Sequence, residues 1–230
     1  MTGEPSVRES PPLSIFDLDR TLTRKPTYTA FMLFAARRLA PWRLFLAPVV
    51  VAGMLAYLAG LIDRRRVKEW EQRFLIGAKV PRSAVVPIAE AFADRIASSG
   101  TFPAAVQRIA QERAEGRRIV LASAANRFYL DAIAARLGID DIVATRSRWE
   151  DDMLLARIDG DNCYGTAKRD MMTRFLRDHQ IKRSKTHVRF FSDHLSDLPS
   201  FEWADECLAV NPSKPLRKLA QQRGWAILDW

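Results

Sequence analysis

Short apolar runs that end in a polar or charged residue recur along the chain. Runs of this length that are apolar throughout are typical of strands buried in a parallel sheet. The runs are LSIFD at 13–17, RIVLAS at 118–123, DIVAT at 141–145, HVRFFSD at 187–193, CLAVN at 207–211 and WAILD at 225–229. The pattern therefore predicts a sheet whose strands come mostly from the second half of the chain.

Helical patterns lie between these runs. Residues 126–137 carry apolar side chains at three- and four-residue spacing and end at Gly138, a typical C-cap residue. Residues 167–179 predict a helix with Thr166 as its N-cap, and 214–223 predict another. Strands that alternate with helices through short links favour right-handed crossovers. The fold class we expect is α/β, with a Rossmann-like parallel sheet and helices on both faces.

One long segment breaks this alternation. From Arg24 to about Thr101 the pattern is helical throughout, and no strand is predicted there. We therefore expect a disordered lead-in over residues 1–12, a sheet-based core of residues 13–23 and 101–230, and an all-helical cap over residues 24–100, inserted after the first strand.

Composition narrows the class of protein. Apolar residues make up 48% of the 230-residue chain and charged residues 27%, which allows a sizeable core and excludes a protein of many membrane spans. The net charge of +9 favours anionic partners. The two cysteines, Cys163 and Cys207, have no metal-ligand spacing, which favours a reducing, cytosolic setting.

Polar side chains follow three of the predicted strands. Ligands bind beyond the carboxyl ends of strands in open parallel sheets, so we expect these side chains to lie together. They are Asp17 and Asp19 after the first strand, Ser123 after the second, and Asp193 and Asp197 after the strand at 187–193, with Lys168 at the start of a helix.

Four segments resemble the motifs of the haloacid dehalogenase (HAD) superfamily of phosphohydrolases, in the same order. They are DLDRTLT, IVLASA, Lys168 and FSDHLSDLP, and they span residues 13 to about 211. The resemblance implies that Asp17 is the nucleophile and Asp19 the general acid and base. It also implies a Mg²⁺ cofactor bound by Asp17, Asp193 and the main-chain carbonyl of Asp19.

The remaining motif residues have supporting roles in this interpretation. Ser123 and Lys168 would bind the phosphate oxygens, and Asp197 would support the metal shell or Lys168. The hydroxyl of Thr21 would orient Asp17 or Asp19. Arg20 stands where the family often has glycine, and His194 where it often has a small residue; the roles of both stay open.

Residues 44–62 contain no charge over 19 positions, a length of about 28 Å as a helix. A single membrane crossing would separate the strand of Asp17 from that of Ser123, so it is excluded. Three interpretations of this segment remain: a buried cap helix, a re-entrant or interfacial hairpin kinked near Pro48 and Gly53, and an oligomer contact. Arginines on both flanks favour attachment to an anionic membrane surface. We expect a peripheral or monotopic protein on the cytoplasmic side of the inner membrane.

The insert resembles the type-1 cap of the subfamily (IB) that contains phosphoserine phosphatase. The likeness is greatest to its branch with the membrane-associated phosphatidylglycerophosphate phosphatase, which implies a phospholipid head group as substrate, such as phosphatidylglycerophosphate or lysophosphatidate. Two alternatives stay open: a soluble small-molecule phosphatase of the phosphoserine type, and a non-enzymatic basic binding module. No nucleic-acid partner is expected, because the basic residues are scattered and no aromatic-interleaved RNA motif occurs. The oligomeric state is left open.

Overall fold

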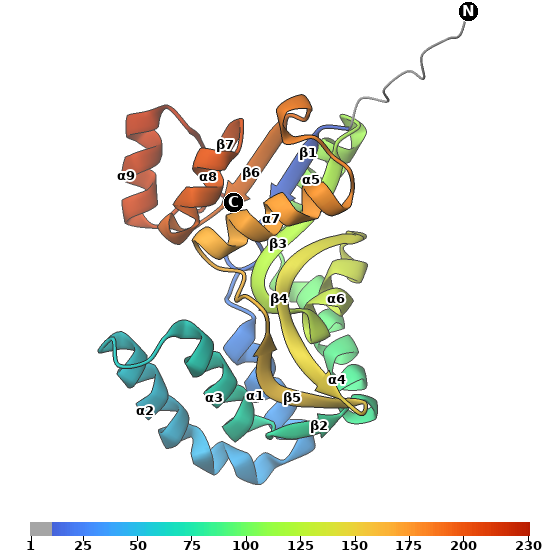
Figure 1. Ribbon diagram of the computed structural model, residues 1–230, viewed down its shortest axis with the longest axis vertical. Coiled ribbons are helices and arrows are strands. Elements are labelled where there is room, and N and C mark those ends of the chain that lie inside the picture. Colours follow the sequence, from blue (N-terminus) through green and yellow to red (C-terminus); the bar gives the residue numbers. More distant parts are fainter. Residues whose placement is uncertain (1–10) are drawn as a thin grey trace, which may run out of the picture.

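One mixed sheet organises the part of the chain that the structure describes. The computed structural model describes residues 11–230, so the predicted lead-in lies almost wholly outside the described residues. The strand order is β2-β5-β4-β3-β1-β6-β7-β8 (Figure 1). The strands are β1 Leu13–Phe16, β2 Lys79–Pro81, β3 Arg118–Asn126, β4 Asp141–Glu150, β5 Met153–Asp159, β6 Val188–Ser192, β7 Glu206–Val210 and β8 Ala226–Leu228.

The parallel part of the sheet confirms all six predicted strands. β1 lies between β3 and β6, parallel to both, and β7 and β8 extend the parallel ladder at one side. β1 is buried on both faces: Leu13 and Ile15 pack into one hydrophobic cluster and Phe16 into the other. This central place explains why its sequence is apolar without alternation.

Helices cover both faces of the parallel part, as predicted. α5 (Pro103–Ala114) and α6 (Arg127–Arg136) pack on one face, and α7 (Thr166–Asp178), α8 (Leu198–Trp203) and α9 (Lys214–Arg223) on the other. One boundary was wrong. The N-cap of α7 is Gly165, which has a left-handed φ of 58°, so the chain turns there and Thr166 is already helical.

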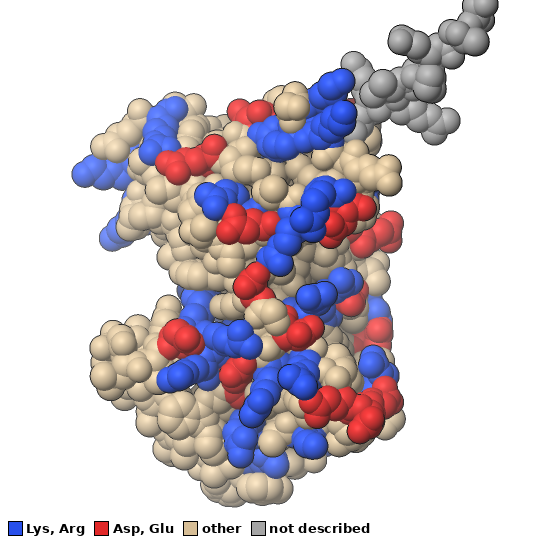
Figure 2. All heavy atoms as spheres, viewed as in Figure 1, with Lys and Arg blue, Asp and Glu red and all other residues tan. Residues whose placement is uncertain are grey.

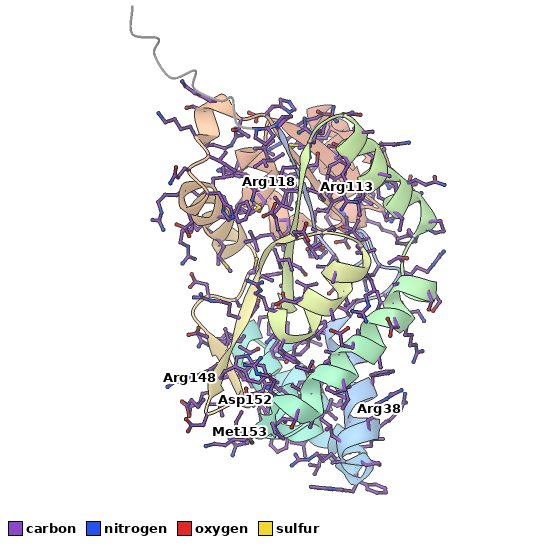
Figure 3. All side chains as sticks on the ribbon, turned by 90° about the vertical axis from the view of Figure 1, so that its right-hand side faces the viewer. Arg38, Arg113, Arg118, Arg148, Asp152 and Met153 are labelled. Carbon is purple, nitrogen blue, oxygen red and sulfur yellow. The ribbon has the colours of Figure 1, made fainter. Side chains whose placement is uncertain are left out.

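Two antiparallel strands were missed, so the sheet is mixed and the insert is not all helical. β5 pairs antiparallel with β4, and the three-residue β2 of the insert pairs antiparallel with β5. The turn between β4 and β5 is Asp151-Asp152, both with positive φ, a known hairpin geometry. Figure 3 shows Arg148, Asp152 and Met153 together at this hairpin tip. β2 is too short to produce a sequence pattern.

Apart from β2, the insert consists of helices, and they lie below β1 and β6 in Figure 1. They are α1 Tyr28–Leu39, the 3₁₀ helix η1 Pro41–Leu46, α2 Ala47–Leu58, α3 Arg64–Leu75, α4 Arg82–Arg95 and the π-helix η2 Ile96–Gly100. The two chain passages that join the insert to the sheet lie side by side, because the Arg24 amide donates to the Gly100 carbonyl at 2.8 Å. α4 packs against α6. The exact division into core and cap stays a prediction.

The charge-free segment 44–62 is broken and exposed. It leaves η1 at Leu46 and enters α2 beside Pro48, where a kink was expected; α2 continues through Gly53. Only Val50 and Gly53 of α2 are buried, so the alternative of a buried cap helix was wrong. Gly53 allows α2 to approach α3, since a Cβ there would lie 3.3 Å from the Trp70 ring. Within residues 11–230, Pro41–Leu58 alone is long and apolar enough to cross a membrane by length and composition.

A buried ion network fixes α5 to β1. The Ser14 hydroxyl and the Arg117, Arg108 and Arg189 guanidinium groups all reach the Glu112 carboxylate, which has no exposed surface. Burial alone would raise the pKa of Glu112, but the Ser14 and Arg108 hydrogen bonds outweigh it, and the pKa is lowered.

We predict that Glu112→Gln lowers the free energy of unfolding by about 3 kcal/mol at pH 7, because it leaves the buried Arg117 and the half-buried Arg108 and Arg189 without their counter-charge. The folded-state pKa lies below the unfolded value of about 4.3, so this stability is complete above that pH and is lost as the pH falls through the folded pKa. Urea unfolding of wild type and variant between pH 3 and 7 measures it. The difference in free energy of unfolding between wild type and variant should become smaller at low pH.

Glu115→Gln is the matched control, because the Glu115 side chain is exposed and pairs with the same Arg189. It should change stability by less than about 0.5 kcal/mol. Equal effects of the two variants would contradict a dominant role for the buried carboxylate.

Candidate active site

The carboxyl ends of β1, β3 and β6 border a cavity of about 290 Å³ that the insert covers from the other side. Figure 2 shows the surface hollowed on its left side, between the part that carries α9 and the part that carries α2. The cavity brings together six of the predicted site residues: Asp17, Asp19, Ser123, Lys168, Asp193 and Asp197.

Lys168 lies at the centre of the site. Its Nζ donates to Asp17 Oδ1 at 2.8 Å and to Asp197 Oδ2 at 2.6 Å, and all three side chains are buried. The Ser192 hydroxyl also donates to Asp197 Oδ2, at 2.7 Å. Three elements, β1, α7 and the turn after β6, are therefore tied together through one ammonium group.

Burial and charge shift the pKa values of this group in opposite directions. Burial raises the pKa of Asp17 to about 8, although Lys168 partly offsets this effect. Burial alone would lower the pKa of Lys168, but Asp17 and Asp197 outweigh it and raise the pKa. Lys168 therefore remains a cation at neutral pH, ready to attract a phosphate dianion.

Asp19 is held by Thr27, a residue that the sequence pattern did not single out. The Thr27 backbone amide and hydroxyl donate to Asp19 Oδ1 at 2.9 and 2.8 Å. Burial raises the pKa of Asp19, against the Thr27 hydrogen bonds, which lower it. The predicted role of Thr21 was wrong, because its buried hydroxyl has no hydrogen-bond partner.

Asp193 is a buried carboxylate without a partner. The residue is 7% exposed, and within residues 11–230 its carboxylate makes no hydrogen bond or ion pair with the side chain of another residue; its own backbone amide contributes a hydrogen bond. Burial, with Asp197 nearby, raises the pKa of Asp193 to about 7. Buried carboxylates are commonly paired with a cation, so this side chain fits a metal ligand.

The donor set at this end of the cavity is made of hard oxygen atoms. Within residues 11–230, no three His, Cys, Asp or Glu side chains form a metal-binding group. Mg²⁺, however, commonly takes only one or two carboxylates and keeps several waters. Asp17, Asp193 and one main-chain carbonyl are compatible with such a coordination of Mg²⁺.

Ser123 lies inside β3 rather than at its end. The register between β3 and β4 shifts between Ser123 and Asn126, so the strand is irregular where it passes the site. The Ser123 hydroxyl accepts from the Ala125 amide at 3.1 Å and lines the cavity. Its O–H is thus free to donate into the cavity.

The two residues left open by the sequence have structural roles at the rim. Arg20 has a φ of 62°, the left-handed region that favours glycine, which is the residue common in the family at this place. Its guanidinium lines the cavity, and its charge opposes the rise in the pKa of Asp193. His194 Nδ1 accepts from the Ser196 amide at 3.2 Å and so caps the following turn.

The insert adds side chains that sequence reasoning missed. Arg64, the first residue of α3, lines the cavity and stacks on the Tyr164 ring at 4.2 Å. Arg64 lies in a run of three arginines, and the pattern did not distinguish the one that faces the site.

We predict that Lys168→Met lowers the free energy of unfolding by about 3 kcal/mol or more, because two buried carboxylates lose their counter-charge. Adding Asp197→Asn should recover part of this loss, since one of the two charges is then removed. Thermal or urea unfolding measures both. Lys182→Met, on the surface, is the control, and an equal effect there would contradict the central place of Lys168.

Structures and sequences of known proteins agree with this geometry. A protein of unknown function from Bordetella pertussis Tohama I superposes with a TM-score of 0.87 at 24% identity, covering 96% of this chain and 99% of that one. A substrate-bound phosphoserine phosphatase superposes with a TM-score of 0.65 at 16% identity, covering 96% and 94%. Both likenesses show the fold.

The sequence relationship is closer. Protein CicA of Caulobacter vibrioides is 34% identical over 170 residues, which is 73% of this chain and 73% of CicA. The family model of haloacid dehalogenase-like hydrolases matches residues 15–202, from β1 to α8. This range contains every residue that lines the active-site cavity. The chain therefore belongs to the haloacid dehalogenase-like hydrolases.

Proposed function

We propose that the protein is a Mg²⁺-dependent phosphomonoester hydrolase that forms a phosphoryl-enzyme intermediate on Asp17. The observation that carries the proposal is the buried Asp17 at the end of β1, with the Lys168 ammonium at 2.8 Å and the Asp19 carboxyl in the same cavity. A carboxylate nucleophile divides one difficult displacement into two easier ones.

In the first step a carboxylate oxygen of Asp17 attacks phosphorus, and the bond from phosphorus to the ester oxygen breaks. Asp19 gives its proton to the departing alkoxide, which leaves as the alcohol; its raised pKa suits this role. In the second step water attacks the phosphorus of the aspartyl phosphate while Asp19 accepts a proton from that water. Inorganic phosphate leaves, and Asp17 is again a carboxylate.

The positive groups of the site reduce the repulsion between an anionic nucleophile and an anionic phosphate. Lys168 and the Ser123 hydroxyl would bind the non-bridging oxygens. Asp17, Asp193 and the main-chain carbonyl of Asp19 would hold Mg²⁺, which when bound supplies further positive charge at the transferring group.

Asp17→Asn is predicted to lower phosphate release by about 10³-fold or more, because the amide is not a competent nucleophile. Asp19→Asn should lower kcat by about 10²- to 10⁴-fold through loss of general acid and base catalysis. Release of inorganic phosphate from p-nitrophenyl phosphate with Mg²⁺ measures both. Asp178→Asn, on the exposed side of α7, is the control. Undiminished activity in Asp17→Asn would exclude this mechanism.

We propose further that the substrate is a phospholipid monoester, such as phosphatidylglycerophosphate or lysophosphatidate, met at an anionic membrane surface on the cytoplasmic side. The support is the exposed apolar side of the insert. Phe45, Leu58 and Leu61 are 87%, 77% and 76% exposed, and Trp42, Val51 and Leu55, from the same stretch of the chain, are also more than half exposed. We call these six residues the apolar cap face.

The charged residues around the apolar cap face support the proposal that it binds an anionic membrane surface. Figure 2 shows few charged side chains over α2 and a cluster of basic ones over the adjacent α3. Arg43 precedes α2, and Arg64–Arg66 follow it. An apolar surface flanked by arginines suits an anionic bilayer, since each basic residue near such a surface contributes about 1 kcal/mol.

Two alternative functions each leave a feature of the structure unexplained. A soluble phosphatase of the phosphoserine type leaves the apolar cap face without a purpose; the likeness to phosphoserine phosphatase, at 16% identity, concerns the fold. A non-enzymatic basic module leaves the buried Asp17, Lys168 and Asp197 group unexplained. O-phosphoserine as a test substrate, and Asp17→Asn as a test variant, separate these alternatives from the proposal.

The double variant Phe45→Glu, Leu55→Glu is predicted to weaken binding to vesicles of phosphatidylglycerol and phosphatidylcholine by at least about tenfold, because two inserted apolar side chains are lost. Flotation of the protein with the vesicles measures binding. Val106→Glu, an exposed apolar position on α5, is the control. No vesicle binding by wild type, together with a dimer by light scattering that the double variant abolishes, would assign the face to an oligomer contact.

A further inference from the structure

A second cavity, of about 280 Å³, adjoins the active-site cavity. The two share Asp19, Pro26, Arg64 and Ala124 as lining residues, and the second is otherwise walled by α1, α2 and α3 of the insert. Asp19 therefore faces both spaces. Because Asp19 would protonate the leaving oxygen, the second cavity is where the alcohol part of a substrate would lie.

A buried carboxyl group forms one polar point of this cavity. Glu71 of α3 is 3% exposed, and its Oε1 has no hydrogen-bond partner. An unpartnered buried acceptor is costly unless a ligand supplies a donor. Glu71 lines the second cavity and not the first.

A buried ammonium group forms the other polar point. Lys68 lies three residues before Glu71, so both side chains project from the same side of α3. Lys68 is 6% exposed, and its Nζ donates to the Ala124 carbonyl at 2.6 Å and to Asn162 Oδ1 at 3.2 Å. Burial lowers the pKa of Lys68 to about 7. In its protonated form the group has three protons, and one of them remains for a ligand.

This pair of groups matches a hydroxyl group. A hydroxyl can accept from the remaining Lys68 proton and donate to Glu71 Oε1 at the same time. The cavity wall carries charges of both signs, Lys68 and Arg64 against Glu71 and Asp19. A substrate with both a carboxylate and an ammonium group would therefore also find opposite charges here, and O-phosphoserine is the test substrate that distinguishes it from a hydroxyl.

Tyr28 and Thr29 of α1 add two hydroxyl groups to the lining, and much of the remaining wall is apolar. Met54, Tyr57, Leu58 and Val67 form this apolar part. Leu58 also belongs to the apolar cap face, and Met54 is partly exposed beside it. The cavity wall and the apolar cap face are thus continuous along α2, which gives an apolar chain a path from the second cavity to the outside.

We propose that the second cavity selects a leaving alcohol that carries a free hydroxyl beside the phosphate ester and an apolar chain directly after it, as in a monoacylglycerol phosphate. The proposal rests on the phosphatase function above and chooses between its lipid candidates. Phosphatidate, with two acyl chains, has no hydroxyl for Lys68 and Glu71. Phosphatidylglycerophosphate has such a hydroxyl, but it would place its charged phosphodiester, rather than an apolar chain, against Met54 and Leu58.

Short, water-soluble esters test the proposal without a membrane. The three substrates are 1-hexanoylglycerol 3-phosphate, 3-hexanoyloxypropyl phosphate, which lacks only the hydroxyl, and glycerol 3-phosphate, which lacks only the chain. We expect kcat/KM for the first to exceed that for each of the others by at least about tenfold, because the analogues leave Glu71 unpaired or the apolar wall empty.

Variants assign the two preferences to their residues. Glu71→Leu should bring the ratio between the hydroxylated and hydroxyl-free esters close to one, and Glu71→Gln, which keeps an acceptor oxygen, should retain part of it. Leu58→Asp should remove the preference for the hexanoyl chain. Leu61→Asp is matched to it, since Leu61 is equally exposed but does not line the cavity, and it should leave the ratio unchanged.

The possible outcomes separate this inference from the proposed function. Hydrolysis of all three esters at similar kcat/KM by wild type would overturn the inference while leaving the phosphatase intact. Faster hydrolysis of O-phosphoserine or of phosphatidylglycerophosphate in micelles than of the monoacyl ester would do the same. Failure to hydrolyse any phosphomonoester, p-nitrophenyl phosphate included, would refute the proposed function itself.

Discussion

The ion pair between Lys168 and its two carboxylates is the constraint on which the site depends. Two buried aspartates from different elements, Asp17 after β1 and Asp197 after β6, would repel one another without the cation between them. Lys168 reaches them because the chain turns sharply at Gly165 and starts α7 beneath the strand ends. One interaction therefore sets the position of Asp17, the proposed nucleophile, and places a positive charge beside it.

The insert closes the site on the side opposite the strand ends, and its helices have different roles. α3 brings Arg64 to the catalytic cavity and Lys68 and Glu71 to the cavity beside it. α2 packs on α3 through Gly53 and leaves most of its side chains exposed. Since α2 forms both the outer surface and a wall of the second cavity, the two lipid proposals involve one helix. The two proposals can be tested independently, because the first concerns binding to a membrane surface and the second concerns the choice of substrate.

Much of the core could be predicted from the sequence, because its strands are mostly apolar and most of its site residues follow them directly. Asp17, Asp19, Lys168, Asp193 and Asp197 lie together as expected. Thr27, Glu71 and Lys68 could not be predicted in the same way. Their roles depend on how the insert folds back over the strand ends. The periodicity of apolar residues in the sequence contains no information about that arrangement. β2 was missed because a strand of three residues produces no recognisable pattern. The predicted hydrogen bond from Thr21 to an aspartate was wrong, because a threonine in the motif loop need not face the aspartates.

The central claim is that Asp17 carries the phosphoryl group between the two steps. The direct measurement is a rapid acid quench of the protein with a phosphomonoester radiolabelled in its phosphate, followed by peptide mapping of the labelled protein. We predict acid-stable label on the peptide that contains Asp17, with none in Asp17→Asn. Label on another residue, or steady phosphate release with no labelled protein at any quench time, would contradict it.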